Sequence, residues 1–102
     1  MKKKHNQDHF DVMRKIDKQP ESSQRYLAEE LGFSLGKLNY CLKKLKEKGL
    51  IKIRNFEKNP NKLNYIYILT PKGIAEKTKL TVSFMKRKME EYEELKKELD
   101  KK

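Results

Sequence analysis

Residues 27–51 read LAEELGFSLGKLNYCLKKLKEKGLI, and this stretch decides the fold of the chain. The first apolar residues of the stretch share one side of a short helix: Leu27, Ala28 and Leu31. Gly32 can adopt the positive φ that ends such a helix. Ser34 follows two residues later and can cap the N-terminus of another helix. The stretch therefore predicts two helices joined by a tight glycine turn.

The second of these helices is apolar on one face and basic on the other. Leu38, Leu42 and Leu45 recur at i, i+4 and i+7 and predict its buried face, and Gly49 ends it. Two helices, a tight turn and a basic outer face on the second helix are typical of a helix-turn-helix. In that motif the second helix enters the major groove of DNA.

The segment before the motif predicts one more amphipathic helix, from about Asn6 to Lys18, with residues 1–5 frayed. Its apolar face is formed by Phe10, Val12, Met13 and Ile16. A proline two residues after Lys18 ends this helix. Ser23, or alternatively Ser22, then caps the first helix of the motif, which we expect to span Gln24–Leu31.

After Gly49 the apolar period changes from helical to alternating. Ile51 and Ile53 point one way in a strand that we expect to have one dry face. Residues 57–62 contain an Asn-Pro-Asn turn, and residues 63–69 form a second strand rich in aromatic and β-branched residues. Three helices followed by such a hairpin are the winged-helix arrangement, a mainly α fold with one small antiparallel β-hairpin.

The last third of the chain predicts one long helix. Thr70 can cap it and Pro71 suits its first position, and about 30 residues would make it roughly 45 Å long. Apolar residues form an a/d seam along it, with Lys96 at one polar position: Val82, Met85, Met89, Tyr92 and Leu99. This coiled-coil-like seam predicts pairing with a second copy. We therefore divide the chain into a DNA-binding domain, residues 1–70, and a dimerisation helix, residues 71–102.

Charge and composition fit this division. The 102 residues carry a net charge of +11, and only 35% of them are apolar. Residues 90–102 contain six acids and four lysines, so the basic charge lies in the body, which we expect to bind a polyanion. The single cysteine allows no internal disulfide and favours the cytoplasm. No apolar run approaches a membrane span, and the N-terminus does not read as a secretory signal.

Several segments carry a resemblance to a known family: residues 23–32, 42–51 and 69–73. In this order they resemble the MarR-type winged-helix transcription regulators. A closer resemblance, to the small exopolysaccharide-associated branch of that family, lies in residues 34–43, 52–56, 61–63 and 80–88. The similarity covers about residues 10–99. It implies a homodimeric repressor or activator that binds double-stranded DNA at a near-palindromic site, with exopolysaccharide genes as targets.

The chain departs from the family pattern in two places. The wing of the family carries an Asp-x-Arg motif, and here Lys62 stands in for the arginine. The chain is also shorter than typical members and lacks the terminal helices that enclose an effector pocket in them. We therefore expect no small-molecule effector, and no cofactor or metal.

The outward face of the second helix of the motif supplies the candidate DNA contacts. Asn39 suits adenine, Lys37 guanine and Leu35 a thymine methyl group, while Gly36 would let the backbone approach closely. The candidates for phosphate contact on or beside this helix are Ser34, Tyr40, Lys43 and Lys44. The same residues would also suit a solvated amphipathic helix.

Two further groups complete the predicted interface. Ser23, Gln24 and Arg25 begin the first helix of the motif, where backbone N–H groups and the arginine can hold a phosphate. The wing offers phosphate or minor-groove contacts: Arg54, Lys58, Asn61 and Lys62. An exposed hairpin with scattered lysines would look similar.

The remaining reactive residues read as structural. We expect Cys41 to pack as a small hydrophobe. His5 and His9 are spaced like a metal site but have no third ligand nearby in sequence, so we expect both to be solvated. No catalytic constellation is present, which predicts that the protein is not an enzyme. The alternatives to a DNA-binding regulator are a protein-interaction module with a helical pairing arm and, less well supported, an RNA-binding protein.

Overall fold

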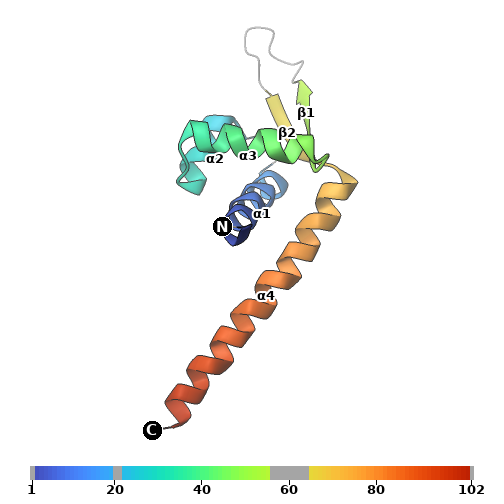
Figure 1. Ribbon diagram of the computed structural model, residues 1–102. Coiled ribbons are helices and arrows are strands. Elements are labelled where there is room, and N and C mark those ends of the chain that lie inside the picture. Colours follow the sequence, from blue (N-terminus) through green and yellow to red (C-terminus); the bar gives the residue numbers. More distant parts are fainter. Residues whose placement is uncertain (1, 20–21, 56–64, 102) are drawn as a thin grey trace.

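The computed structural model of the protein describes residues 2–19, 22–55 and 65–101. The elements in chain order are α1 (Lys2–Lys18), α2 (Gln24–Leu31), α3 (Leu35–Glu47), β1 (Ile51–Asn55), β2 (Tyr65–Leu69) and α4 (Pro71–Asp100). Helices α1, α2 and α3 form one body, the hairpin rises beside the C-terminal end of α3, and α4 extends away from both (Figure 1). The Cα atoms extend 65 Å along the longest axis and 26 Å and 24 Å across.

A small hydrophobic core lies between the first three helices and the base of the hairpin. It consists of Val12, Met13, Ile16, Leu27, Ala28, Leu38, Cys41, Leu42, Leu45, Leu50, Ile51 and Tyr67. The predicted leucine face of α3 is buried, which confirms the helical pattern of the opening stretch. Because this face points inward, the opposite, polar face of α3 must point to solvent.

The ends of the helices follow local sequence signals. Ser23 caps α2 by accepting a hydrogen bond from the Tyr26 amide, and Ser34 caps α3 by accepting one from the Lys37 amide. Gly32 has φ of 69°, the left-handed conformation that ends α2. The predicted caps and the turn of the helix-turn-helix are confirmed.

Helix α1 begins earlier than the sequence suggests. We expected frayed residues up to position 5, but the helix starts at Lys2. The physical reason is that residues 2–6 contain no proline or glycine and that lysine is a good helix former. Nothing in this segment therefore prevents the helix from extending N-terminally beyond the part that packs on the core.

The hairpin is antiparallel, with Ile51 paired to Leu69 at its base and Asn55 paired to Tyr65 at its outer end. The expectation of one dry face is correct only at the base. Ile51 is buried, but Ile53 is 37% exposed. Its partner across the hairpin, Tyr67, belongs to the core, so the helices cover β2 at this level and leave β1 open to solvent. The predicted turn over residues 57–62 and the start of the second strand, residues 63–64, lie outside the described residues.

The start of α4 is held against the turn that follows α3. The Thr70 hydroxyl accepts from the Gly73 amide at 3.0 Å and donates to the Gly49 carbonyl at 2.6 Å. The Thr70 amide donates to the Leu50 carbonyl at 3.0 Å. Gly73 is buried, and a Cβ at this position would overlap the Leu50 carbonyl oxygen. The segment Leu69–Gly73 therefore fixes the direction in which α4 leaves the body.

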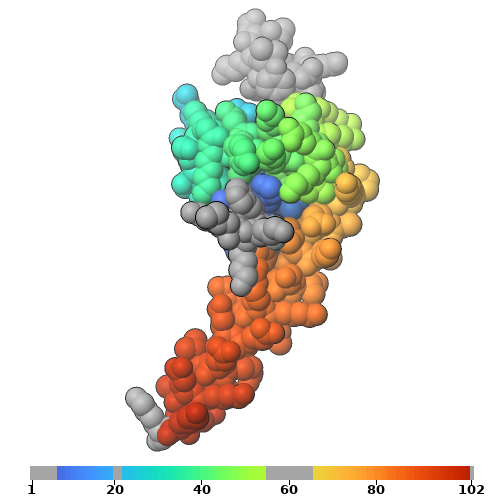
Figure 2. Space-filling model, in the orientation of Figure 1, coloured from blue at the N-terminus to red at the C-terminus, as the bar shows by residue number. Residues whose placement is uncertain are grey.

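Helix α4 spans 30 residues, as predicted. Its first half packs on α1, where the Phe10 and Phe84 rings stack with centroids 4.8 Å apart and the Lys77 ammonium lies 3.0 Å from the Asp17 carboxylate. Its second half is exposed from residue 88 to residue 101 and projects beyond the body (Figure 2). No helix in the described part of the chain is both long enough and apolar enough to span a membrane.

Candidate nucleic-acid interface

The N-terminal half of α3 presents a mixed apolar and polar surface to solvent. Leu35 is 46% and Tyr40 51% exposed, and Asn39 is exposed beside them. Nothing lies within 4 Å of the position that a Cβ would take at Gly36. Large apolar side chains on a surface helix, next to a gap where a backbone can be approached, suit contact with a partner rather than with water. The structure thus places these four predicted residues together on one helix.

Lys37 differs from its neighbours because its side chain turns toward α1. Its ammonium lies 3.4 Å from the Asp8 carboxylate and 4.1 Å from the centroid of the Phe33 ring. Both contacts hold the cation against the body of the protein. Contact of Lys37 with a guanine stays a prediction, and it would require the side chain to leave Asp8.

The C-terminal half of α3 carries the basic residues. Lys43 is exposed, whereas Lys44 is partly held by Glu47 at 3.6 Å and by the Tyr40 ring at 5.6 Å. Lys46 is also exposed, and it is not among the residues predicted from the sequence. It follows Asn39 by seven residues, so the helical period that placed Asn39 could have identified it.

The start of α2 combines free backbone donors with one cation. Ser23 and Arg25 are exposed, and the first N–H groups of a helix point at any anion placed on its axis. Gln24 contributes differently from what we expected for a phosphate contact. Its side-chain amide donates to the Tyr67 hydroxyl and so joins α2 to β2, which leaves the backbone N–H as its means of contact.

Part of the predicted wing can be placed. Arg54 is exposed on β1, and so is Lys52, which is not among the interface residues predicted from the sequence. Both lie on the strand that follows α3, one pleat apart and therefore on the same side of the hairpin. The other three wing candidates, Lys58, Asn61 and Lys62, lie outside the described residues.

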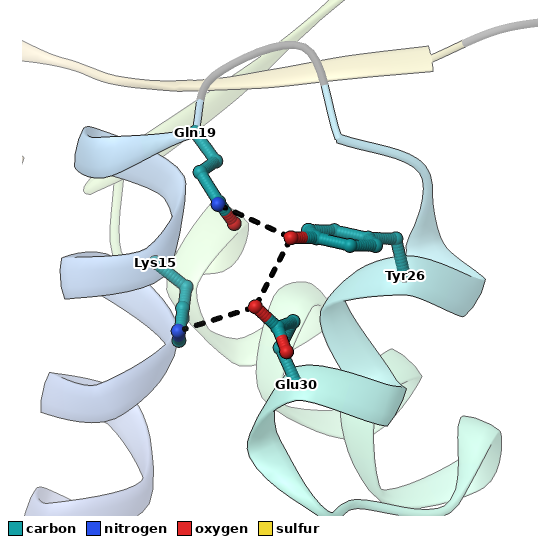
Figure 3. A network of polar contacts seen from close by, with 4 residues as sticks. All are labelled: Lys15, Gln19, Tyr26 and Glu30. Atoms are coloured by element: carbon teal, nitrogen blue, oxygen red, sulfur yellow. Dashed lines mark hydrogen bonds and ion pairs between the residues drawn. The ribbon is translucent and has the colours of Figure 1, made fainter.

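A network of polar contacts fixes α2 against α1 (Figure 3). The Tyr26 hydroxyl donates to the Glu30 carboxylate at 3.0 Å and accepts from the Gln19 side-chain amide at 3.2 Å. The Lys15 ammonium lies 3.7 Å from the same carboxylate. Sequence patterns gave no signal for this network, because Lys15 and Gln19 come from α1 and the residue after it, whereas Tyr26 and Glu30 lie on α2. The network holds α2 in a fixed place relative to the C-terminal end of α1.

Cys41 and His9, the residues considered for a redox site and a metal site, are both buried in the body of the protein. Cys41 is buried, as expected, and burial raises the pKa of its thiol, with a further increase from the Asp8 carboxylate and an opposing effect of Lys37. His9 is only 7% exposed, so the expectation of a solvated histidine is wrong. It lies on the face of α1 that packs against the core. In the described residues no group of three or more potential metal ligands comes together.

The predicted seam of α4 is open to solvent along its length. Val82, Met85, Met89, Tyr92 and Leu99 are between 47% and 75% exposed. Leu95, which the seam did not include, is 62% exposed. The exposure of the seam agrees with what pairing requires, and the pairing itself stays a prediction.

Comparisons with known proteins match this geometry. A family model described as winged helix-turn-helix DNA-binding matches residues 9–52. No curated protein sequence matches the chain significantly. Among solved structures, MarR of Staphylococcus aureus, in complex with salicylate and kanamycin, is similar with a TM-score of 0.69 and 20% identity, over 84% of this chain and 56% of that one.

Two similar structures contain DNA. FabT of Streptococcus pneumoniae in complex with DNA matches with a TM-score of 0.65 and 24% identity, over 85% of this chain and 59% of that one. The transcriptional repressor CouR, bound to a 23-mer DNA duplex, matches with a TM-score of 0.70 and 25% identity, over 84% of this chain and 59% of that one. The chain thus spans little more than half the length of these regulators.

The fold is that of a winged helix-turn-helix protein, and residues 9–52 match a family model described as DNA-binding. Its arrangement of three helices, a hairpin and a long fourth helix is the fold of the MarR-family transcription regulators. The family model describes a DNA-binding motif, and several of the similar structures are named as regulators of transcription.

Proposed function

We propose that the protein is a homodimeric, sequence-specific regulator of transcription that binds a near-palindromic site in double-stranded DNA in the cytoplasm. The observation that carries the proposal is the N-terminal half of α3. It presents Leu35, Gly36 and Asn39 side by side to solvent, on a helix whose opposite face is fully buried. Such a helix fits the major groove, where its N-terminal residues meet base edges.

The charges around α3 support contact with the DNA backbone. Lys43 and Lys46 lie farther along the helix, Arg25 lies at the start of α2, and Lys52 and Arg54 lie on the adjacent strand. All five are exposed. Because they lie on α3 and on the two elements that contact it, α2 and β1, they can hold phosphates beside the proposed base-reading residues. Affinity should then fall with salt, by a log–log slope of about −0.9 for each phosphate neutralised.

The exposed seam of α4 supports dimerisation. A two-fold symmetric dimer would present two α3 helices to successive major grooves, about 34–36 Å apart along the duplex. The resemblance of the sequence to the exopolysaccharide-associated branch supports exopolysaccharide genes as the regulated targets.

Selection of bound duplexes from a random pool tests the proposal most directly. We expect enrichment of one sequence with two inverted half-sites whose centres lie about 10 base pairs apart. Sedimentation of the protein alone should show a dimer. A chain that stays monomeric and enriches no sequence would contradict the proposal and would favour a protein-interaction module.

The salt dependence of binding provides a second readout with the same protein. Titrations of the selected duplex and of a scrambled duplex at several salt concentrations should show tighter binding of the selected one throughout. Equal competition by random and selected duplexes would contradict sequence specificity while leaving non-specific DNA binding in place.

A further inference from the structure

A groove of about 550 Å³ lies between α1 and the first half of α4. Its apolar surface is formed by the stacked rings of Phe10 and Phe84 and continues onto Met85 and Met89. The two methionines belong to the predicted seam, so the groove and the seam form one continuous apolar surface. An open apolar surface of this size on a chain of 102 residues calls for an occupant.

The charged residues that line the groove are mostly basic. Lys77 is paired with Asp17 at 3.0 Å. Arg14, Lys18 and Lys88 also line the groove, and all three are exposed. The four cations and one anion give the lining a net charge of +3. An occupant should therefore be apolar on one side and acidic at its margins.

The second half of α4 has this combination. Its exposed apolar residues are Tyr92, Leu95 and Leu99, and each is directly preceded by a glutamate: Glu91, Glu94 and Glu98. Residues 89–100 contain six acids and two lysines, whereas residues 71–88 contain six basic residues and one acid. The two halves of the same helix are thus complementary in charge.

Tyr92, Leu95 and Leu99 form a stripe along α4, and its position on the helix agrees with a reciprocal contact between two copies. Thr81, Phe84 and Lys88 line the groove. Tyr92, Leu95 and Leu99 follow them by eleven residues each, which is close to three full turns, so both sets lie on one face of α4. A contact between two copies through one shared face is the kind that closes as a two-fold dimer.

We propose that the acidic second half of α4 from one protomer lies across the basic groove between α1 and α4 of the other, and the reverse. This inference rests on the proposed homodimer and names the surfaces that form it. Each protomer supplies one apolar stripe and one groove, so two copies satisfy each other. Parallel helices in register would instead place the six acids of one copy beside the six acids of the other.

Charge reversal tests this arrangement. One variant reverses the groove, Arg14→Glu with Lys88→Glu, and a second reverses the stripe, Glu94→Lys with Glu98→Lys. Each variant alone should weaken the dimer, with an increase of at least about tenfold in its dissociation constant at low salt, because like charges then meet at both contacts. All four residues are exposed, so the helix content measured by circular dichroism should not change.

Two combinations make the test specific. An equimolar mixture of the two variants should form heterodimers, and a single chain that carries all four substitutions should again dimerise with itself. The matched control, Lys79→Glu with Lys86→Glu, removes the same charge from the opposite face of α4 and should dimerise like the wild-type chain. Sedimentation equilibrium measures all of these states.

The outcomes separate this inference from the proposed function. A dimeric wild-type chain whose groove and stripe variants dimerise as tightly as the control would overturn the inference and leave the homodimer standing. Failure of the mixture and of the fourfold variant to recover the dimer would also overturn it. A monomeric wild-type chain would overturn both the inference and the proposed homodimer.

Discussion

Gly73, in the first turn of α4, lies directly against the carbonyl group of Leu50, and a Cβ at position 73 would overlap that carbonyl oxygen. The overlap involves backbone on both sides, so a side-chain rotation cannot relieve it. The contact explains why the segment after the hairpin ends in glycine: α4 can approach the end of α3 this closely only without a side chain there.

The first prediction is that Gly73→Ala destabilises the protein. Forcing atoms into a closely packed site costs about 1–3 kcal/mol, and urea unfolding should show a lower midpoint. Gly36→Ala is the matched control, because nothing lies within 4 Å of the position its Cβ would take. That change should leave stability unchanged or raise it by up to about 1 kcal/mol. Equal midpoints for Gly73→Ala and the wild-type chain would contradict the close contact.

The second prediction separates base reading from phosphate binding on α3. Asn39→Ala should cost about 1–3 kcal/mol on the selected duplex and relax the preference at one base pair. Lys43→Ala should weaken binding to selected and scrambled duplexes alike and reduce the salt slope by about 0.9. Fluorescence anisotropy titrations on both duplexes measure the difference. Identical losses on both duplexes for Asn39→Ala would rule out its role in sequence reading.

The third prediction concerns the carboxylate that holds Lys37. Asp8→Asn should release the ammonium, which lies 3.4 Å away, and let it contact DNA. Binding to a scrambled duplex at low salt should tighten by up to about fivefold, in line with the energy of a partly exposed ion pair. Asp11→Asn removes the same charge from α1 at a residue that accepts a hydrogen bond from Gln7, and it is the control. Equal effects of the two substitutions would contradict the prediction.

The fourth prediction tests the seam of α4. Met89→Asp places a charge on an apolar position that is 64% exposed in the single chain, so the folded protomer should tolerate it. The dimer should dissociate, and DNA binding should weaken as a consequence. Ser83→Asp adds the same charge at an exposed position away from the seam and should do neither. If Met89→Asp sediments as a tight dimer, the seam is assigned to the wrong residues.

The fifth prediction is a pH dependence that belongs to Cys41. Burial, together with Asp8, raises the pKa of the thiol in the folded protein above its ordinary value of 9.0. Above pH 9.0 the unfolded chain therefore loses this proton before the folded chain does, and the free energy of unfolding falls as pH rises further. Well below pH 9.0 the thiol is protonated in both states and contributes no slope.

Comparison with Cys41→Ala isolates this effect from other groups that titrate in the same range. The variant will be less stable at every pH because a buried side chain is shortened. The difference in unfolding free energy between the two proteins should shrink between pH 9 and pH 10.5. A constant difference would show that the thiol titrates alike in both states.

Much of the fold was predictable because its signals are local. Ser23, Ser34 and Thr70 each cap a helix within three residues of themselves, and Gly32 ends α2 through its own φ angle. The apolar period of α3 identified its buried face, and the same period identified its exposed candidates. The features that sequence patterns missed join distant elements. The Gln24 side chain contacts Tyr67, and the Lys37 side chain contacts Asp8.

These missed contacts have a common physical reason. A residue on the polar face of a helix can point to solvent or to a neighbouring element, and the choice depends on where that element packs. Lys37 lies at the margin of α3 nearest α1, so it meets Asp8, while Lys43 at the centre of the outer face stays free for solvent. His9 was misjudged for the same reason, since its burial depends on how α1 packs against the rest of the body.

The contacts of Thr70 and Gly73 with the end of α3 have a mechanical consequence. They join α4 rigidly to α3, so in the proposed dimer the angle between the two α4 helices would set the distance between the two α3 helices. Over the roughly 45 Å length of α4, a rotation of about 5° at its far end displaces α3 by about 4 Å. That is on the order of the 3.4 Å between successive base pairs. A small change in the crossing angle of the two α4 helices would therefore favour DNA sites with a different spacing between their half-sites.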